Sequence, residues 1–294
     1  MTYDYALITP ARNEGNRIAK TLESIINQTR KPVLWVIVND GSTDNTADIV
    51  GDYALRHDFI KCISVDGQGR KNFSSKVNAF NRGLNLLSGI DYSFIGNLDA
   101  DVSFEPLYFQ QLLQEFQKAK NLGLAGGLIV EYANNRFREQ KVSINSVAGA
   151  VQLFRREAFE QVGGYFPMKY GGVDSAIEIK VRMKGWEVRT FPDLKVIHHG
   201  PVVTGKKSPL QARFNKGIIN YTLGYHPLFQ CVISIFRMLH PPFILGGLLM
   251  MSGYFWAALC KTEIKLPEEV VRFLRAEQLK RLKNVFTGKN GFRQ

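Results

Sequence analysis

The sequence predicts an α/β fold, with a mostly parallel sheet covered by helices on both faces and a C-terminal helical appendage. Three observations predict it. Apolar segments of strand length alternate with amphipathic helical segments through the first hundred residues, as is typical of parallel strands buried between helices. Polar or acidic turns follow the apolar segments. The last third of the chain combines uncharged apolar runs with basic ones, and a chain of 294 residues accommodates one large domain plus an appendage.

The predicted elements repeat the order strand, turn, helix. Apolar runs predict the buried strands, and the helical segments carry apolar side chains at helical spacing, as Ile18, Leu22 and Ile25 do. Polar residues able to cap a helix precede the helical segments. The predicted strands are residues 5–11, 33–38, 60–65, 92–96 and 186–191, and the predicted helices are residues 17–28, 75–87, 175–184 and one that starts near residue 45.

Carboxylates follow the predicted strands. In a parallel sheet, ligands bind at the carboxyl ends of the strands, so we expect these side chains to converge on one cleft: Glu14, Asp40, Asp66, Asp99 and Asp101. An Asp-x-Asp pair at a strand end suits Mg²⁺ or Mn²⁺, because these cations take carboxylate oxygens together with the phosphate oxygens of a substrate. A solvated acidic turn is the alternative interpretation of such a triplet.

Four segments resemble the successive motifs of family 2 glycosyltransferases. They are Thr-Pro-Ala-Arg-Asn-Glu at 9–14, Val-Asn-Asp-Gly-Ser-Thr-Asp-Asn-Thr at 38–46, Lys76 with Asn-Arg-Gly at 81–83, and Asp-Ala-Asp at 99–101. The resemblance covers residues 3–200 and implies the GT-A fold, with a nucleotide-binding half followed by an acceptor half. It also implies that the sugar donor is bound by Pro10, Ala11, Arg12, Asn13, Glu14, Asp40, Lys76 and Asp99.

The resemblance gives individual roles to these residues. Asp40 would accept a hydrogen bond from an N–H of the nucleobase, as uracil and guanine present, and capping of a turn is its alternative role. Lys76 matches a basic residue near the donor phosphates, although an ordinary solvated helix lysine has the same appearance in a sequence. Arg70 and Lys71 have no motif match and could equally form an exposed basic loop.

The candidate general base lies in the second half of the resemblance. The family pattern is Glu-Asp followed about eleven residues later by Gly and an aromatic residue, and Asp174, Gly185 and Trp186 keep that spacing. Inverting transfer needs a base that takes the proton of the acceptor hydroxyl, so we assign Asp174 to that role. Val173 replaces the Glu of the pattern, which leaves the acceptor class open. Capping of its helix is the alternative for Asp174.

A histidine pair completes the metal site that the resemblance implies. His198 and His199 end a strand-like segment, and strand alternation sends their side chains to opposite faces. We expect one of them to reach the cation and favour His198, with His199 as the alternative. The predicted ligands of a Mn²⁺ or Mg²⁺ ion are therefore Asp99, Asp101 and His198.

The charge distribution divides the chain. Of the net charge of +12, residues 201–294 carry +10, from fourteen Lys and Arg against four Glu. We therefore predict a catalytic domain over residues 1–205 and a basic, hydrophobic, helical region associated with a membrane over residues 206–294. The three cysteines show no metal-ligand spacing, which favours a reducing compartment, and the first strand starts so early that no signal peptide is expected.

The membrane prediction depends on an uncharged run. Between Arg237 and Lys261 lie 23 residues without Asp, Glu, Lys or Arg, and a spanning helix needs about 20 apolar residues. One span would place the basic residues 206–207 and the basic tail on opposite sides, against the usual bias of positive charge. We favour two short helices that dip into one leaflet, and a helical pair packed on the protein is the alternative. Residues 266–283 predict a basic amphipathic helix suited to anionic lipid.

Taken together, the sequence predicts a metal-dependent inverting glycosyltransferase at the cytoplasmic face of the cell membrane. It would move a sugar from a nucleotide diphosphate sugar to a lipid-linked or glycan acceptor, without a nucleic-acid partner. Two alternatives stay open. Val173 is compatible with a nucleotide-sugar-binding or assembly subunit, and a sugar-phosphate nucleotidyltransferase shares the layered sheet. The second would need a glycine-rich basic loop after the first strand, where residues 10–14 carry one arginine, one glutamate and no glycine.

Overall fold

The computed structural model describes residues 3–65, 73–133, 136–139, 143–200 and 208–287. Its chain forms two compact units. Unit 1 holds the described residues up to 167 together with 180–200, and unit 2 holds residues 168–179 and those from 208 onward. Several sequence predictions concern positions outside the described residues, namely Asp66, Arg70, Lys71, Lys206 and Lys207.

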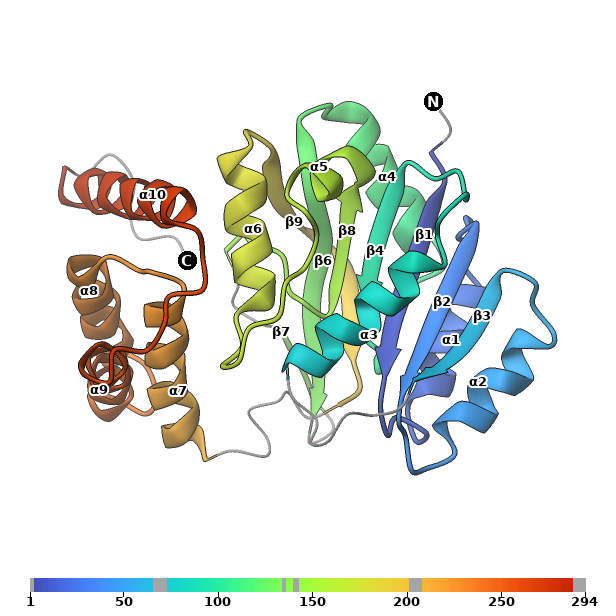
Figure 1. Ribbon diagram of the computed structural model, residues 1–294, viewed down its shortest axis with the longest axis horizontal. Helices are drawn as coiled ribbons and strands as arrows, with labels where there is room; N and C mark the ends of the chain where they lie inside the picture. The colour runs from blue at the N-terminus through green and yellow to red at the C-terminus, as the bar shows by residue number, and fades with distance from the viewer. Residues whose placement is uncertain (1–2, 66–72, 134–135, 140–142, 201–207, 288–294) are drawn as a thin grey trace. The chain divides into compact units, whose positions relative to one another are not determined.

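Unit 1 is built on one sheet (Figure 1). Nine strands of the described chain pair in the order β3-β2-β1-β4-β8-β6-β9-β5, with β7 paired to β6. The strands are β1 (Tyr5–Ala11), β2 (Leu34–Asp40), β3 (Ile60–Val65), β4 (Phe94–Leu98), β5 (Val102–Phe104), β6 (Leu122–Ala133), β7 (Arg136–Glu139), β8 (Val151–Arg155) and β9 (Glu187–His198).

The strand pairings divide the sheet into a parallel half and a mixed half. β3, β2, β1 and β4 are mutually parallel, as their apolar sequences predict. β8 then pairs antiparallel with both β4 and β6, and β5 pairs antiparallel with β9. The sequence analysis did not predict these antiparallel pairs. They extend the sheet beyond β4. Because β9 runs in the same direction as β4, the carboxyl ends of the two strands lie at the same edge of the sheet.

Helices cover both faces of this sheet (Figure 1). α1 (Ile18–Ile26), α2 (Thr46–Ala54) and α4 (Tyr108–Lys118) share one core with the strands. In that core, Tyr5 stacks on Phe109 with 4.8 Å between ring centroids. α3 (Phe73–Asn85) lies on the other face, where Gly83 meets Ile8, Val36 and Val38. α5 (Arg156–Gln161) joins α3 on that face through the ring contact of Phe80 with Phe159. Both faces are thus covered, as the apolar strands predict.

Unit 2 is helical. It contains α7 (Pro209–Thr222), α8 (Pro227–Met238), α9 (Leu245–Leu259) and α10 (Glu268–Phe286), and the boundary between the units falls within α6 (Val173–Met183). α7 and α9 pack with their backbones in close approach, because a Cβ atom on Gly217 would lie 2.0 Å from the carbonyl oxygen of Met250. Gly253 is equally close to the carbonyl oxygen of Phe214. Larger residues at either glycine would force the two helices apart.

The uncharged run does not form one long helix. α8 and α9 are separate helices of 12 and 15 residues, and no helix in the described part of the chain is both long enough and apolar enough to cross a membrane. α9 buries one face on its neighbours and exposes the other. The exposed large apolar side chains of α8, α9 and the turn between them form what we call the apolar face: Leu228, Ile235, Leu239, Phe243, Ile244, Leu245, Leu248, Phe255, Trp256 and Leu259.

α10 differs from the expected amphipathic membrane helix in one respect. Most of its apolar side chains are buried within unit 2, as Val271 and Leu274 show, although Leu279 is 41% exposed. Arg275 fixes the helix by donating from Nε to the carbonyl oxygen of Gly224 at 2.9 Å, and Gln278 accepts from the backbone N–H of His226 at 2.8 Å. The surface that α10 leaves exposed therefore carries mainly its cations, among them Arg272 and Lys280.

Candidate active site

The turn that follows β1 is held against the turn that follows β2. Asn13 is the centre of this contact: its backbone N–H donates to Ser42 Oγ at 3.0 Å, and its Oδ1 accepts from the backbone N–H of Thr43 at 2.8 Å. Asn13 has a φ of 55°, a left-handed conformation that Asn adopts more readily than most residues. The N–H of Glu14 donates to Thr46 Oγ1 at 2.9 Å. Side chains of the second motif thus fix the backbone of the first.

Asp40 lies at the carboxyl end of β2 and is 7% exposed. Arg12 approaches it from the turn after β1, with 3.8 Å between Nη1 and Oδ2. Asn39 precedes it and braces the turn, because its Oδ1 accepts from the N–H of Ser42 at 3.1 Å. This bracing role of Asn39 was not predicted, although Asn39 lies in the 38–46 motif directly before Asp40. A buried carboxylate and a guanidinium therefore lie together beside the turn that follows β1.

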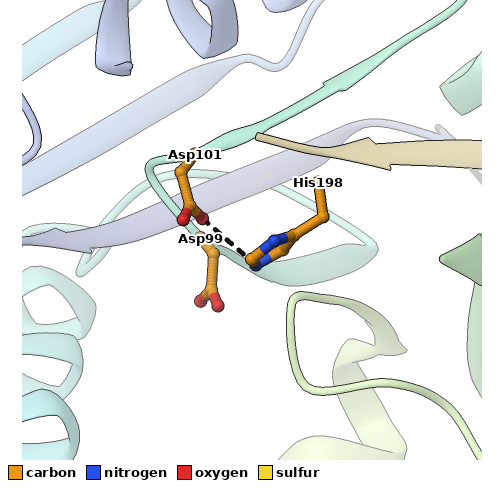
Figure 2. A group of neighbouring side chains, drawn as sticks. All are labelled: Asp99, Asp101 and His198. Carbon is orange, nitrogen blue, oxygen red and sulfur yellow. Dashed lines mark ion pairs between the residues drawn. The ribbon is translucent and has the colours of Figure 1, made fainter. Parts of the chain in front are cut away.

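The sheet register brings Asp99, Asp101 and His198 together (Figure 2). Asp99 follows β4, Asp101 precedes β5, and His198 ends β9 opposite Val102. One ligand atom from each side chain lies within 4.8 Å of the others. Figure 2 shows the imidazole directed at the Asp101 carboxylate, with 3.5 Å between Nε2 and Oδ1. Two carboxylates and one imidazole are a donor set that fits a divalent cation such as Mn²⁺.

Backbone contacts orient both Asp101 and His198. His198 Nδ1 lies 2.9 Å from the carbonyl oxygen of Gly200. When Nδ1 carries the proton and donates it there, the lone pair of Nε2 faces the cluster, which is the usual arrangement of a metal-binding histidine. A Cβ on Gly200 would lie 2.1 Å from Asp101 Oδ2, so any larger residue would displace this carboxylate. The sequence analysis missed Gly200, because only the folded chain brings it to Asp101.

His199 is directed away from the cluster. Its backbone N–H donates to the carbonyl oxygen of Asp101 at 2.8 Å, while its Nε2 lies 2.7 Å from Ser103 Oγ. Burial lowers the pKa of His199, and the nearby Lys20 and His198 lower it further. The two imidazoles therefore lie on opposite sides of β9, and the one that faces the two carboxylates is that of His198.

The cluster concentrates negative charge. Burial raises the pKa of Asp101, and the neighbouring Asp99 carboxylate raises it further, whereas His198 and Arg17 act in the opposite direction. Glu14 also raises this pKa, which shows that the turn after β1 lies within electrostatic reach of the cluster. A bound divalent cation would offset the repulsion between the two aspartates, so the electrostatics and the donor set point to the same kind of ligand.

Lys76 reaches the cluster from α3. Its Nζ lies 2.5 Å from Asp99 Oδ1, as in a charge-assisted hydrogen bond. The Lys76 side chain is nevertheless 41% exposed, so its role near the donor phosphates stays a prediction. Lys76 thus places an ammonium group beside one of the two carboxylates of the cluster.

Asp174 belongs to unit 2 and is the second residue of α6. The helix is closed at its start by the carbonyl oxygen of Gly172, which accepts from the N–H of Ala176 at 2.9 Å. Asp174 therefore lies inside the first turn, one position beyond the N-terminal residue of the helix. The partial positive charge of a helix N-terminus favours the ionised form of a carboxylate there.

Comparison with known proteins identifies the family. The model of Glycosyl transferase family 2 matches residues 6–170, more than half of the chain. The chain belongs to glycosyl transferase family 2. A curated relative in this family, the poly-beta-1,6-N-acetyl-D-glucosamine synthase of Staphylococcus epidermidis, is 28% identical over 202 residues. The alignment covers 61% of this chain and 46% of the relative, so the chain spans about half the length of such relatives.

Two solved structures of glycosyltransferases share the fold. One is the mannosyltransferase PcManGT from Pyrobaculum calidifontis in complex with GDP-Man and Mn²⁺, with a TM-score of 0.56 and 19% identity over 98% of this chain and 83% of the other. The second is TarS of S. aureus in complex with UDP-GlcNAc, with a TM-score of 0.55 and 12% identity over 96% of this chain and 81% of the other. The GT-A fold that the sequence resemblance implies is thereby confirmed.

Proposed function

We propose that this family 2 protein is a metal-dependent inverting glycosyltransferase that uses a nucleotide diphosphate sugar. The observation that carries the proposal is the convergence of Asp99, Asp101 and His198 beside the turn after β1 in a family 2 chain. Support comes from the two structural neighbours, which hold GDP-Man with Mn²⁺ and UDP-GlcNAc. In this proposal the cation is Mn²⁺, because the imidazole favours it over Mg²⁺.

The residues divide the reaction between them. Asp40 and the turn of residues 10–14 would hold the nucleoside, Asp99 would contact the ribose and help to hold the cation, and Lys76 would contact the phosphates. The acceptor oxygen attacks the anomeric carbon of the donor sugar. The bond between this carbon and the diphosphate oxygen breaks, and the configuration at the carbon inverts. Asp174 takes the proton of the acceptor hydroxyl. The nucleoside diphosphate leaves with the electron pair, and its charge would be stabilised by Lys76 and by a cation held by Asp99, Asp101 and His198.

A donor panel tests this proposal. We expect Mn²⁺ together with one nucleotide sugar among UDP-GlcNAc, UDP-GalNAc, UDP-glucose and GDP-mannose to raise the melting temperature of the purified protein, because a ligand that binds only the folded state stabilises it. The same donor should yield free nucleoside diphosphate when a glycan acceptor is added. Stabilisation without product release would favour the nucleotide-sugar-binding subunit. Release of pyrophosphate from a nucleoside triphosphate and a sugar phosphate would favour the nucleotidyltransferase.

We further propose that unit 2 attaches the protein to the cytoplasmic face of an anionic membrane, where a lipid-linked or glycan acceptor is reached. The apolar face supports this proposal: Trp256 and Leu259 are 58% and 79% exposed, and large exposed apolar side chains gathered on two packed helices suit a membrane or partner surface. The exposed cations of α10 add attraction to anionic lipid. α8 and α9 would lie in the interface, because their apolar side chains are divided between a buried face and an exposed one.

Vesicle binding tests the attachment. The double variant Trp256→Asp/Leu259→Asp should bind vesicles of phosphatidylcholine and phosphatidylglycerol at least about tenfold more weakly than the wild type, since burial of one large apolar side chain contributes about 1.5–3 kcal/mol. Co-sedimentation measures this. Leu55→Asp is the matched control, because Leu55 is 87% exposed on unit 1, and it should bind like the wild type. Unchanged sedimentation of the double variant would rule out insertion of the apolar face.

A further inference from the structure

The start of α6 packs against one face of α7 within unit 2. A Cβ on Gly172 would lie 2.8 Å from Ile219 Cγ2 and 3.4 Å from Leu223 Cδ1. Lys216 precedes Ile219 by three positions and Leu223 by seven, so all three lie on the same face of α7. Since Ile219 and Leu223 already face Gly172, Lys216 also lies on the side of α7 that faces α6.

Two carboxylates lie along α6 on the side that Lys216 reaches. Asp174 and Glu178 are four positions apart, which places them one turn apart on one helix face. Glu178 is only 4% exposed, although a charged side chain is rarely buried without a compensating charge. Lys216 interacts electrostatically with both carboxylates. The three charges form a group that we call the α6–α7 charge cluster.

We propose that Lys216 is a positioning residue that holds the Asp174 carboxylate in its ionised, proton-accepting form, and that Glu178 anchors Lys216 from the other side. This inference rests on the proposed function, because it gives the α6–α7 charge cluster a task only if Asp174 is the general base. It also supplies a second carboxylate near the base in a chain where Val173 stands at the usual position of that carboxylate.

The other charges around the cluster agree with this assignment. Burial by surrounding protein lowers the pKa of Lys216, the carboxylates of Glu178 and Asp174 raise it, and Arg213 on the preceding turn of α7 lowers it. The Lys216 side chain nevertheless keeps an exposed surface, so water assists the two carboxylates in keeping the ammonium group charged. A lasting positive charge beside Asp174 favours the carboxylate over the carboxylic acid.

Two substitutions should move the pH profile in opposite directions. A base must be ionised to act, so activity falls at acidic pH as Asp174 takes up a proton. Lys216→Met removes the favourable charge and should move the acidic limb of kcat/KM to higher pH by about one unit, whereas Glu178→Gln removes a like charge and should move it to lower pH. The profile is measured as nucleoside diphosphate release with the best donor of the panel and the glycan acceptor.

Matched variants separate this role from a structural one. Lys216→Arg keeps the charge and should retain the wild-type acidic limb, and Lys31→Met removes one exposed charge from unit 1 and should also leave it in place. The inference would be overturned if Lys216→Met and Glu178→Gln lowered activity without moving the acidic limb, or moved it in the same direction. The proposed function would still stand in that case, provided that the wild type transfers sugar and Asp174→Asn is inactive. Absence of transfer by the wild type would instead refute the proposed function and the inference with it.

Discussion

Replacement of Asp101 by Asn is expected to reduce glycosyl transfer by at least about 10²-fold, the upper range of the loss seen when only an outer partner of a metal ligand is removed. The amide keeps the size of the side chain but lowers its charge and its affinity for a hard cation. In the proposed mechanism, loss of the cation would remove the main source of charge stabilisation for the leaving diphosphate. Steady-state release of nucleoside diphosphate in Mn²⁺ measures the effect.

The fold should survive this substitution, and the pKa of Asp101 gives the direction in which the melting temperature should change. The pKa of Asp101 is raised by burial and by Asp99, so the stability that this group contributes is greatest at low pH and is lost as the pH rises through its folded pKa. At neutral pH, Asp101→Asn removes a buried negative charge from beside another. The melting temperature of the metal-free variant should therefore equal or exceed that of the wild type, while the increase caused by Mn²⁺ should be lost.

The neighbouring histidines provide a matched pair for the same measurement. His198→Gln should weaken the stabilisation by Mn²⁺, because Nε2 of His198 faces Asp101. His199→Gln should leave it in place, since the ring nitrogen of His199 contacts Ser103 instead. Asp101→Asn with wild-type turnover and wild-type Mn²⁺ stabilisation would remove this carboxylate from the proposed site. If His198→Gln and His199→Gln lost the stabilisation by Mn²⁺ to the same extent, His198 would not be a specific ligand of the proposed metal site.

The sequence predicted the mutually parallel strands β1 to β4, whereas it did not predict β5, β6, β7 or β8. β1 and β2 are apolar runs buried on both faces, so their composition alone identifies them. β5 is a three-residue strand defined by its pairing with β9, and no local pattern distinguishes such a strand from a turn. The antiparallel partners of β8 likewise lie far away in the sequence, since Gly96 pairs with Leu153 and Ala125 pairs with the same residue.

The candidate site shows the same division. Strand alternation predicts that His198 and His199 face opposite sides, because this rule acts between adjacent residues, whereas the preference for His198 came from the family resemblance. Gly200 contacts Asp101 across ninety-nine positions of sequence, and the approach of Lys76 to Asp99 depends on where α3 crosses the sheet. Contacts of this kind follow from packing between elements, for which one sequence carries no direct signal.

Unit 2 shows why an apolar run alone did not determine an arrangement. The sequence left a spanning helix, two interfacial helices and a packed pair as candidates. The glycines of α9 favour a packed arrangement over a single spanning helix. The backbone of α7 approaches α9 closely at Gly253, so that one face of α9 is buried. A hydropathy average gives glycine the same weakly apolar value whichever face of the helix it occupies. In the fold, however, the glycines of α9 allow close packing on one face only.

Replacement of Asp174 by Asn is the second substitution with a large expected effect. Loss of a general base typically costs about 10² to 10⁴ in rate, and we expect kcat to fall within that range. Asn keeps the size of Asp, and because Asp174 lies within the first turn of α6 rather than at the capping position, the helix should keep its start. Donor binding should be unchanged, since the donor residues assigned here all belong to unit 1.

Two measurements separate the effect of Asp174→Asn on proton transfer from its effect on donor binding. Rapid mixing measures the rate of a single turnover, and the thermal shift caused by donor and Mn²⁺ measures donor binding. Asp193→Asn is the control, because Asp193 is an exposed carboxylate on β9 and should turn over at the wild-type rate. If Asp174→Asn lost donor binding along with turnover, the carboxylate would contribute to binding the donor rather than to proton transfer. If it kept a wild-type rate, the proton would have to leave by another group, and the α6–α7 charge cluster would have no base to act on.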